Sequence, residues 1–499
     1  MDIKSLKDKI LQLAIQGKLV PQNENDEPAS VLLEKIRLEK EKLIKDKVIK
    51  KEKSFPEIDE DEKRFELPNG WEWIRLGEFI RFIGGNQPPK STFKYEYQDG
   101  YIRLIQIRDY KSDSHITYIP IEKAKRFCGK DEVMIGRYGP PIFQILKGIE
   151  GAYNVALMKA DPIEGISKDY LFYLLKDHLL LRKLEHLASR TCGQDGIDMD
   201  TLKSYVVGLP PLVEQERIVA KIDELFQLVD SLGNNKQELL ENIYNSRNKV
   251  LQLAIQGKLV EQCEDDEPTS ILLEKIKEEK EQLIKNKIIK KEKPLPEISE
   301  EEKRFELPKG WEWYRLGEAG YFQKGFAFKS KDYVDEGIKI TKVSNLNNPN
   351  SKDLVYIDIV NESLYEQYKL YNDDIVLTTV GSWPTAPASV VGNAIYINDN
   401  FDNTLLNQNA VRIRSKLNQE YLYIVLNSKL FKNYIIDIAQ GTANQASITQ
   451  DGIKSFVFPV PPLEEQKRIV DKVDLIMDYL DKLQQEIESQ EIILEDILQ

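Results

Sequence analysis

The segment Leu11–Val20, LQLAIQGKLV, recurs letter for letter at Leu251–Val260, 240 positions later. A second string, RFELPNGWEW at Arg64–Trp73, recurs with one change at Arg304–Trp313 and at the same spacing. Identical ten-residue strings are hard to obtain by chance, so the chain contains an internal repeat, and the period of that repeat has to be settled before any fold is assigned.

A third pair of strings shows how the repeat continues. PPLVEQERIVAKID at Pro210–Asp223 matches PPLEEQKRIVDKVD at Pro461–Asp474, here 251 positions apart, so the second intervening block has gained eleven residues. With these offsets Gln499 corresponds to Asn248, and the next residue of the middle copy corresponds to Lys9. The last helix should therefore stop where the first segment begins. We expect a circular, pseudo-two-fold arrangement in which both chain ends together rebuild what the middle contains unbroken.

The repeated strings lead into helices with a regular apolar seam. Apolar residues there alternate in steps of four and three, which is typical of a coiled coil. We expect the helices within residues 210–260 and 460–499 to pack antiparallel as a long spacer, and two core helices of ordinary domains are the simpler alternative. The predicted seam residues are Ile218, Ile222, Leu225, Val229 and Leu232, followed by Ile469, Val473, Ile476, Leu480 and Leu483.

A further helix is predicted before each globular block, over Pro28–Lys53 and Pro268–Lys293, because an acidic residue precedes proline at each start. Its mixture of Lys and Glu favours a solvated face over a nucleic-acid patch. The resulting plan has an N-terminal half of the distal helix region at 1–20, a linker helix at 21–66, a first block at 67–209, a central helix at 210–260, a linker helix at 261–305, a second block at 306–459 and a C-terminal helix at 460–499.

Both blocks are predicted to be mixed α/β, with the same order of elements and different sequences. Such a pair is typical of two readers with different targets. The first block is predicted to have strands at Tyr101–Arg108, Glu132–Tyr138 and Tyr153–Lys159, a helix at Lys168–Ser189 and a turn at Cys192–Gly196; the second, strands at Gly337–Val343, Asp374–Val380, Ala394–Ile397 and Ala410–Arg414 and a helix at Gln419–Ala439.

The composition does not by itself suggest a nucleic-acid ligand. The net charge is −13, although the two blocks sum to zero and the helical remainder carries all of it. Since phosphate contacts need Lys and Arg, any DNA-binding face would have to be local. No run of 18 apolar residues occurs and the N-terminus lacks a signal-peptide layout, so we expect a cytosolic protein. Three cysteines, at 128, 192 and 263, match no zinc spacing.

Three apparent catalytic motifs fail on their chemistry. Gly84–Ser91 resembles a phosphate loop, but Pro89 stands where the second glycine must be, and proline offers no N–H to a phosphate. Gly139–Phe143 resembles the adenine-methyltransferase tetrapeptide but lacks the Asn or Asp acceptor. The three histidines, His115, His178 and His186, do not have the spacing of metal ligands. The simplest interpretation of His178 and His186 is that they are ordinary helix residues.

Several of the repeated strings together resemble the specificity subunits of type I restriction-modification systems. The resemblance rests on WEWxRLGE at Trp71–Glu78 and Trp311–Glu318, on LPPLxEQxRIV at Leu209–Val219 with its variant at Val460–Val470, and on the QLAxxGKLV segments. It implies two target recognition domains that each read one half of a bipartite, asymmetric DNA target. It also implies repeated helices that hold two methyltransferase subunits and fix the spacer, and outer restriction/translocase subunits.

The resemblance further implies that this chain has no active site and no cofactor of its own. S-adenosylmethionine, ATP and Mg would belong to the partner subunits alone. The chain would thus be a DNA-binding protein of a restriction system and not an enzyme. Two rivals stay open: a fused nuclease or methylase, which would turn over substrate alone, and a structural coiled-coil adaptor with two protein-binding modules, which would bind protein without salt sensitivity.

Base edges in the major groove are read by Arg, Lys, Asn, Gln, Ser and Thr side chains on loops and strand ends. Clusters of these residues are the candidate DNA contacts, with a solvated polar surface as the alternative for each residue. Asn407–Asn409 and Gly441–Gln445 are weaker candidates. The candidates are Asn86, Gln87, Lys90, Ser91, Thr92, Arg103, Gln106, Arg108, Arg137, Tyr138 and Gln144 in the first domain, and Gln323, Lys324, Lys329, Lys331, Lys342, Ser344, Asn345, Thr378, Thr379, Ser382 and Trp383 in the second.

Overall fold

The computed structural model describes residues 3–51, 53–139, 141–163, 165–188, 197–287, 289–291, 293–348, 353–358, 362–386, 389–442 and 445–497. The predicted turn at Cys192–Gly196 lies outside these residues. The chain divides into two units, residues 1–237 with 489–499 and residues 238–488. Each unit combines helices with small sheets, which confirms the predicted mixed α/β class. In the described part of the chain, no helix is both long and apolar enough to cross a membrane.

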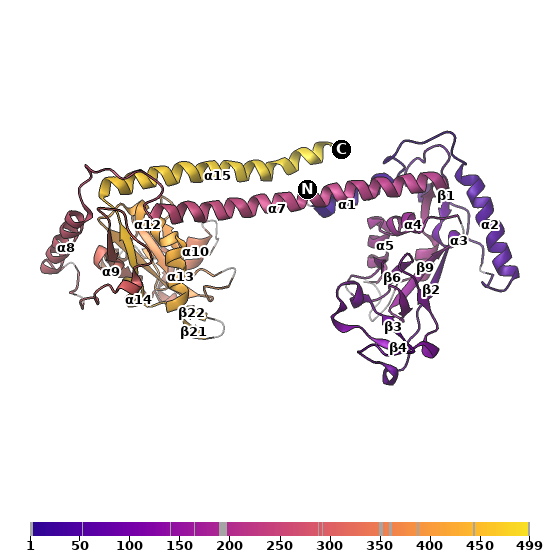
Figure 1. The fold of residues 1–499 in the computed structure, drawn as a ribbon, viewed down its shortest axis with the longest axis horizontal. Helices are drawn as coiled ribbons and strands as arrows, with labels where there is room; N and C mark the ends of the chain where they lie inside the picture. The colour runs from indigo at the N-terminus through magenta and orange to yellow at the C-terminus, as the bar shows by residue number, and fades with distance from the viewer. Residues whose placement is uncertain are drawn as a thin grey trace. The chain divides into compact units, whose positions relative to one another are not determined.

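The described residues of the first unit form three sheets, and Figure 1 shows how the elements are arranged. A two-stranded pair, β1–β10, joins the two repeated strings that flank the block. One four-stranded sheet has the order β2-β9-β6-β7, and the other, β4-β3-β8-β5, contains the parallel pair β3–β8 and lies on the side away from α7. The elements are α1 Ile3–Ile15, α2 Ala29–Lys45, β1 Glu72–Arg75, α3 Leu76–Phe79, β2 Ile80–Gly84, β3 Tyr101–Ile105, β4 Tyr118–Pro120, β5 Phe127–Cys128, β6 Val133–Gly136, β7 Gln144–Leu146, β8 Gly151–Tyr153, β9 Leu157–Pro162, α4 Lys168–Leu174, α5 His178–Ala188, α6 Met199–Ser204, β10 Val206–Leu209 and α7 Leu212–Ile255.

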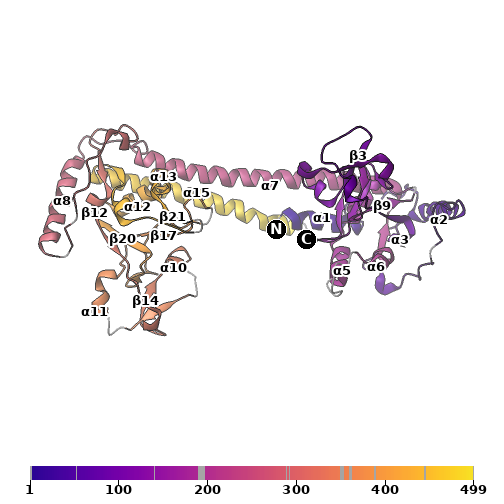
Figure 2. The same ribbon diagram turned by 90° about the horizontal axis from the view of Figure 1, so that it is seen from below.

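The second unit repeats this plan. Its sheets have the orders β11-β23, β12-β20-β16-β18, β13-β15-β14-β19 and β17-β22-β21. In the third of these β14 runs parallel to β19, and β14 lies on the side away from α15 (Figure 2). The elements are α8 Thr269–Lys285, β11 Glu312–Arg315, α9 Leu316–Ala319, β12 Gly320–Lys324, β13 Tyr333–Val334, β14 Ile338–Thr341, α10 Val343–Asn347, β15 Val355–Ile357, α11 Glu362–Tyr365, β16 Ile375–Thr378, β17 Val380–Gly381, β18 Ala394–Tyr396, β19 Leu405–Leu406, β20 Ala410–Ser415, α12 Gln419–Asn427, α13 Lys429–Ile438, β21 Gln440–Thr442, β22 Gln445–Ser447, α14 Gln450–Lys454, β23 Val457–Val460 and α15 Leu463–Ile497.

Two predicted long helices are each broken in two. The helix predicted from Lys168 is interrupted at Asp177, whose carboxylate accepts a hydrogen bond from the backbone N–H of Leu179 at 2.9 Å. The helix predicted from Gln419 is interrupted at Ser428, whose Oγ accepts from the N–H of Phe431 at 3.4 Å. In each case a capping side chain starts a new helix where the apolar pattern alone predicts one continuous helix.

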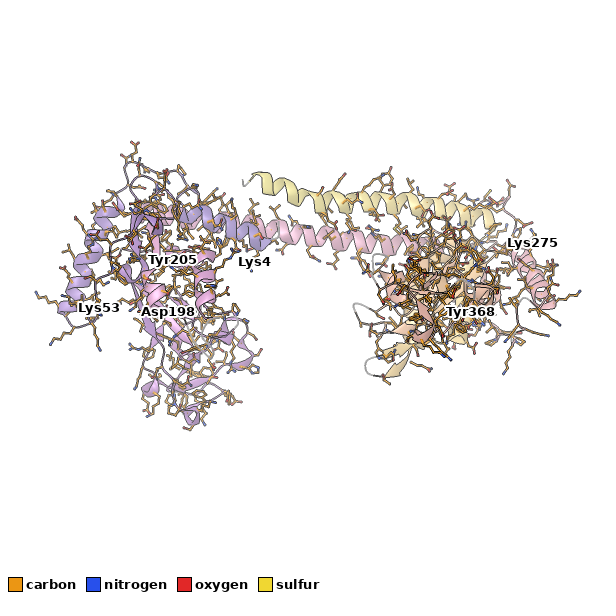
Figure 3. All side chains as sticks on the ribbon, turned by 180° about the vertical axis from the view of Figure 1, so that it is seen from behind. Lys4, Lys53, Asp198, Tyr205, Lys275 and Tyr368 are labelled. Carbon is orange, nitrogen blue, oxygen red and sulfur yellow. The ribbon has the colours of Figure 1, made fainter. Side chains whose placement is uncertain are left out.

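The cap at Asp177 also anchors the interior of the first unit. Its carboxylate accepts hydrogen bonds from the Tyr205 hydroxyl at 2.7 Å and from Arg64 at 3.0 Å, and Tyr205 lies among the packed side chains of this unit (Figure 3). The equivalent positions of the second unit are Ser428 and Phe456, both buried. The two units therefore share this helix break but stabilise it differently.

The linker helices end before the predicted positions. They cover Ala29–Lys45 and Thr269–Lys285, and each is followed by a lysine with positive φ, Lys47 at 58° and Lys287 at 60°. A left-handed residue after the last turn ends a helix by redirecting the backbone, although glycine is the usual choice there.

Buried Arg75 fastens the segment after α2 to the first domain. It is 3% exposed, and its guanidinium donates to both carboxylate oxygens of Glu62, at 2.8 and 2.7 Å, and to the backbone carbonyl of Ser204 at 2.7 Å. The hydrogen bond from Arg75 is the main cause that lowers the pKa of Glu62. Arg315 makes the equivalent bonds to Glu302 in the second unit.

The predicted seam residues are buried near the start of each long helix and partly exposed farther along it. Ile218 and Ile222 at the start of α7 join the core of the first unit, together with residues of α1 and α2. Ile469 and Val473 do the same in the second unit. Farther along, the equivalent residues Leu232 and Leu483 are each 43% exposed. Most of the seam burial thus fixes the long helices to their own globular blocks.

Helix pairing follows the sequence repeat. In the first unit Lys7 of α1 forms an ion pair with Asp230 of α7 at 2.6 Å. In the second unit Arg247 of α7 pairs with Asp481 of α15, also at 2.6 Å, and both partners are displaced by the repeat offsets of 240 and 251. Residues 489–497 of α15 group with the first unit, as the predicted meeting of the chain ends requires.

Candidate nucleic-acid interface

Four loops of the first unit meet at the carboxyl ends of the parallel strands β3 and β8. They are residues 85–92 after β2, 106–110 after β3, 137–139 with 141–143 after β6, and 154–156 after β8, and together they are called the first loop cluster. Backbone hydrogen bonds join them: Asn86 N–H to Tyr153 O at 3.1 Å, Asn154 N–H to Ile105 O at 3.1 Å and Arg137 N–H to Ala156 O at 2.9 Å. The cluster brings together three of the residue groups predicted as DNA contacts.

Gly85 has a structural role in this cluster. A Cβ atom at position 85 would lie 1.9 Å from the carbonyl oxygen of Asn154, a separation that no side chain tolerates. The glycine therefore permits the close approach of two backbone segments. The Gly84–Gly85 pair needs no bound phosphate to explain it.

The predicted contacts of the first domain differ in how free they are. Gln87, Lys90, Ser91, Arg108 and Tyr138 are exposed, and Asn86, Thr92, Arg103, Gln106, Arg137 and Gln144 are half-buried. The Arg137 guanidinium lies 5.2 Å from the centre of the Tyr138 ring and donates to Val155 O at 3.5 Å. Further side-chain hydrogen bonds run from Thr92 to Pro89 O, from Gln87 to Pro88 O, from Arg103 to Asp113, from Gln106 to Thr117, from Arg108 to His115 O and from Gln144 to Pro141 O.

The predicted strand through Arg103, Gln106 and Arg108 ends early. β3 stops at Ile105, and Gln106 caps a short 3-10 turn by donating its N–H to Asp109 at 3.0 Å. The three side chains therefore do not share one strand face. Asp109 is buried 3.8 Å from Arg108 and 3.9 Å from Arg103. Burial raises the pKa of Asp109, against the opposing effects of the Gln106 N–H and the two arginines.

The second unit repeats the cluster bond for bond. Residues 325–332, 342–346, 379–386 and 407–409 form the second loop cluster. Phe326 N–H donates to Leu406 O at 2.9 Å, Asn407 N–H to Thr341 O at 3.0 Å and Thr379 N–H to Asn409 O at 2.9 Å. A Cβ at Gly325 would lie 2.0 Å from Asn407 O, as at Gly85. The scaffold is thus duplicated, although the polar side chains on it differ.

Three predicted contacts of the second domain are buried. Asn345 is 2% exposed, accepts the Lys342 N–H at 3.0 Å and donates to Asp353 O at 3.1 Å. Thr378 is fully buried and donates to Val390 O, and Thr379 is 8% exposed. These three side chains support the loops from inside in this conformation.

The other predicted contacts of the second domain reach the surface. Lys324, Lys329, Lys331 and Ser344 are exposed. Gln323, Lys342, Ser382 and Trp383 are half-buried, with hydrogen bonds from Gln323 to Lys324 O, from Lys342 to Asp353 and from Trp383 to Thr442 O. Of the weaker candidates, Asn407–Asn409 lies in the cluster, and part of Gly441–Gln445 lies outside the described residues.

The loop after β8 was missed because a single strand was predicted over Tyr153–Lys159. The structure divides it into β8 and β9, separated by Asn154–Ala156. The Asn154 side chain accepts the N–H of Ala156 at 3.1 Å, a turn that asparagine commonly forms. An asparagine inside an apolar run was the available signal.

Comparison with known proteins gives one consistent result. The family model for the type I restriction modification DNA specificity domain matches residues 68–242 and 308–495. The EcoAI and EcoEI specificity subunits of Escherichia coli type I restriction enzymes are 33% and 30% identical, over 96% and 98% of this chain and 90% and 91% of theirs.

Solved structures share the fold. A chain from a type I R-M system, solved to explain complex assembly and conformational transition, has a TM-score of 0.56 at 20% identity over 87% of this chain and 97% of that one. The HsdS subunit of Thermoanaerobacter tengcongensis has a TM-score of 0.51 at 18% identity over 88% and 97%.

Proposed function

The chain belongs to the family of type I restriction-modification DNA specificity subunits, and from that premise we propose that residues 67–209 and 306–459 each read one half of a bipartite, asymmetric target. Its role is DNA recognition without catalysis. We further propose that methylation and cleavage are carried out by two methyltransferase subunits and by restriction/translocase subunits. Those partners would use S-adenosylmethionine, ATP and Mg, and the complex would work in the cytoplasm beside the host DNA.

The observation that carries the proposal is the duplicated loop cluster. The same backbone hydrogen bonds fix both clusters, while the side chains at equivalent positions differ in chemistry. Arg108 corresponds to Ser344, because Gln106 and Lys342 donate their N–H groups to Asp109 and Asn345 in the same way. Because sequence is read by side chains on base edges, equal scaffolds with unlike side chains suit two different half-sites.

The long helices support the remaining part of the proposal. α7 runs unbroken for 44 residues, or about 66 Å at 1.5 Å per residue, and takes part in both units. Leu228 and its equivalent Tyr479 are 55% and 64% exposed on α7 and α15. Large apolar residues exposed twice at repeat-related positions suit two copies of one partner, here the methyltransferase subunit.

Methylation sequencing tests the proposal. The chain is expressed with its cognate methyltransferase subunit, and the host genome should carry one split methylated motif. Replacing residues 67–209 with the first domain of another family member should change one half of that motif and leave the other half intact. An unsplit motif, or one that the exchange does not alter, would contradict the assignment.

A further inference from the structure

The loop between the parallel strand and the next long strand lies at the centre of each cluster. In the second unit its backbone is fixed on both sides of Gln408: Asn407 N–H donates to Thr341 O at 3.0 Å, and Asn409 O accepts from Thr379 N–H at 2.9 Å. The loop is therefore held by the last residue of β14 and by the first residue of the loop 379–386.

The side-chain amide of Gln408 is available to bind a ligand. Gln408 is exposed, and its amide has no hydrogen-bond partner among the residues that the structure describes. By contrast, the side chains of Asn345 and Trp383 in the second cluster donate hydrogen bonds to backbone carbonyls. Gln408 thus combines a fixed backbone with a free donor and acceptor, which is the combination that base readout needs.

The equivalent residue of the first unit is Val155. It is 38% exposed, and among the residues that the structure describes only its backbone carbonyl forms a hydrogen bond, with the guanidinium of Arg137. One position in two equal scaffolds therefore carries an amide in one unit and an aliphatic group in the other. Such a difference changes the base that can be read without any change to the backbone.

We propose that positions 155 and 408 determine specificity, and that Gln408 reads an adenine in the half-site of the second domain. A glutamine amide can accept from adenine N6 and donate to adenine N7 at once. Val155 can offer only an apolar contact, which suits the methyl group of thymine. This inference rests on the proposed function and adds the residue and the base to it.

The test uses the full chain assembled with its methyltransferase subunits. Binding is measured to the cognate duplex and to duplexes with one substituted base pair each. Gln408→Ala should lose roughly tenfold of the discrimination at one A·T pair of the second half-site, because one bidentate contact is worth about that factor or more. Gln408→Glu, which can only accept, should move the preference at that pair towards cytosine. Gln282→Ala, an exposed glutamine on α8, is the matched control and should change nothing.

The outcomes separate the two levels of the argument. If the wild-type complex discriminates no split target, the proposed function is wrong. If it does, but Gln408→Ala discriminates fully at every position or weakens all duplexes equally, only the assignment of Gln408 is wrong. Thermal unfolding is recorded for each variant, and Gln408→Glu, which keeps the size of the side chain, decides the case if Gln408→Ala unfolds.

Discussion

Arg247 and Asp481 join the second half of α7 to α15 by an ion pair of 2.6 Å, and this contact repeats the Lys7–Asp230 pair between α1 and the first half of α7. The sequence repeat is therefore also a repeat of tertiary contacts. α7 takes part in both ion pairs. Its Asp230 occupies the position that Asp481 has in α15, and its Arg247 occupies the position that Lys7 has in α1.

The Arg247–Asp481 pair should be coupled measurably but weakly. Both side chains are partly exposed, at 29% and 55%, so we expect a coupling free energy of about 0.2–1 kcal/mol. A double-mutant cycle with Arg247→Ala and Asp481→Ala, followed by urea unfolding, measures it. Additive single effects would show that the pair contributes nothing to helix pairing.

Gly85→Ala and Gly325→Ala should each disable one half-site. The new Cβ would lie only 1.9 or 2.0 Å from a backbone carbonyl oxygen, so the substitution has to displace the loop. We expect the free energy of unfolding to fall by about 1–3 kcal/mol. We also expect recognition to be lost in the corresponding half of the motif. Gly84→Ala is the control, since the nearest atom to its Cβ lies 3.8 Å away. Equal damage to both halves of the methylated motif would argue against separate readers.

Lys90 and Lys331 should contribute affinity without specificity. Both are exposed at the edges of their clusters, where a lysine can meet a phosphate. Replacing either with alanine should reduce the slope of log K against log salt by about 0.9 and leave base discrimination unchanged. Lys275, which projects from α8 (Figure 3) and pairs with Glu267, provides the control substitution. An altered base preference would instead assign the lysine to base readout.

The Glu62–Arg75 ion pair should make the free energy of unfolding depend on pH in the acid range. The pKa of Glu62 is lowered in the folded state, chiefly by its hydrogen bond from Arg75. Its contribution is therefore complete above the pKa of the unfolded carboxyl group and is lost as the pH falls through the lower, folded value. Glu62→Gln should cost about 1 kcal/mol near neutral pH and flatten the acid limb of a Tm-against-pH curve. A parallel shift of the whole curve would mean that the ionised carboxylate is not the stabilising form. Glu302→Gln should behave alike, because Arg315 lowers the pKa of Glu302 in the same way.

Much of the architecture was predictable from identical strings and apolar spacing. The repeat, the long helices and the two mixed blocks all follow from local or periodic signals. The helix breaks at Asp177 and Ser428 were missed because the apolar pattern continues across a capping residue. Both residues are good N-caps, so the signal was present in the sequence.

The loop clusters were only partly predictable. Asn86 and Tyr153 meet through a backbone hydrogen bond between segments far apart in the chain, and no local pattern encodes that contact. Composition also does not show that Asn345 and Thr378 are buried and donate to backbone carbonyls, and their contact with DNA stays a prediction. β16, the strand that contains Thr378, is buried along its whole length, and the sequence alone does not show which polar residues such a strand encloses.

The grouping of residues 489–497 with the first unit has a consequence for biosynthesis. A ribosome makes the first unit's globular block early, but the helix turns that finish this unit emerge only after the entire second unit has been translated. The first unit is thus completed only after the second unit has been synthesised.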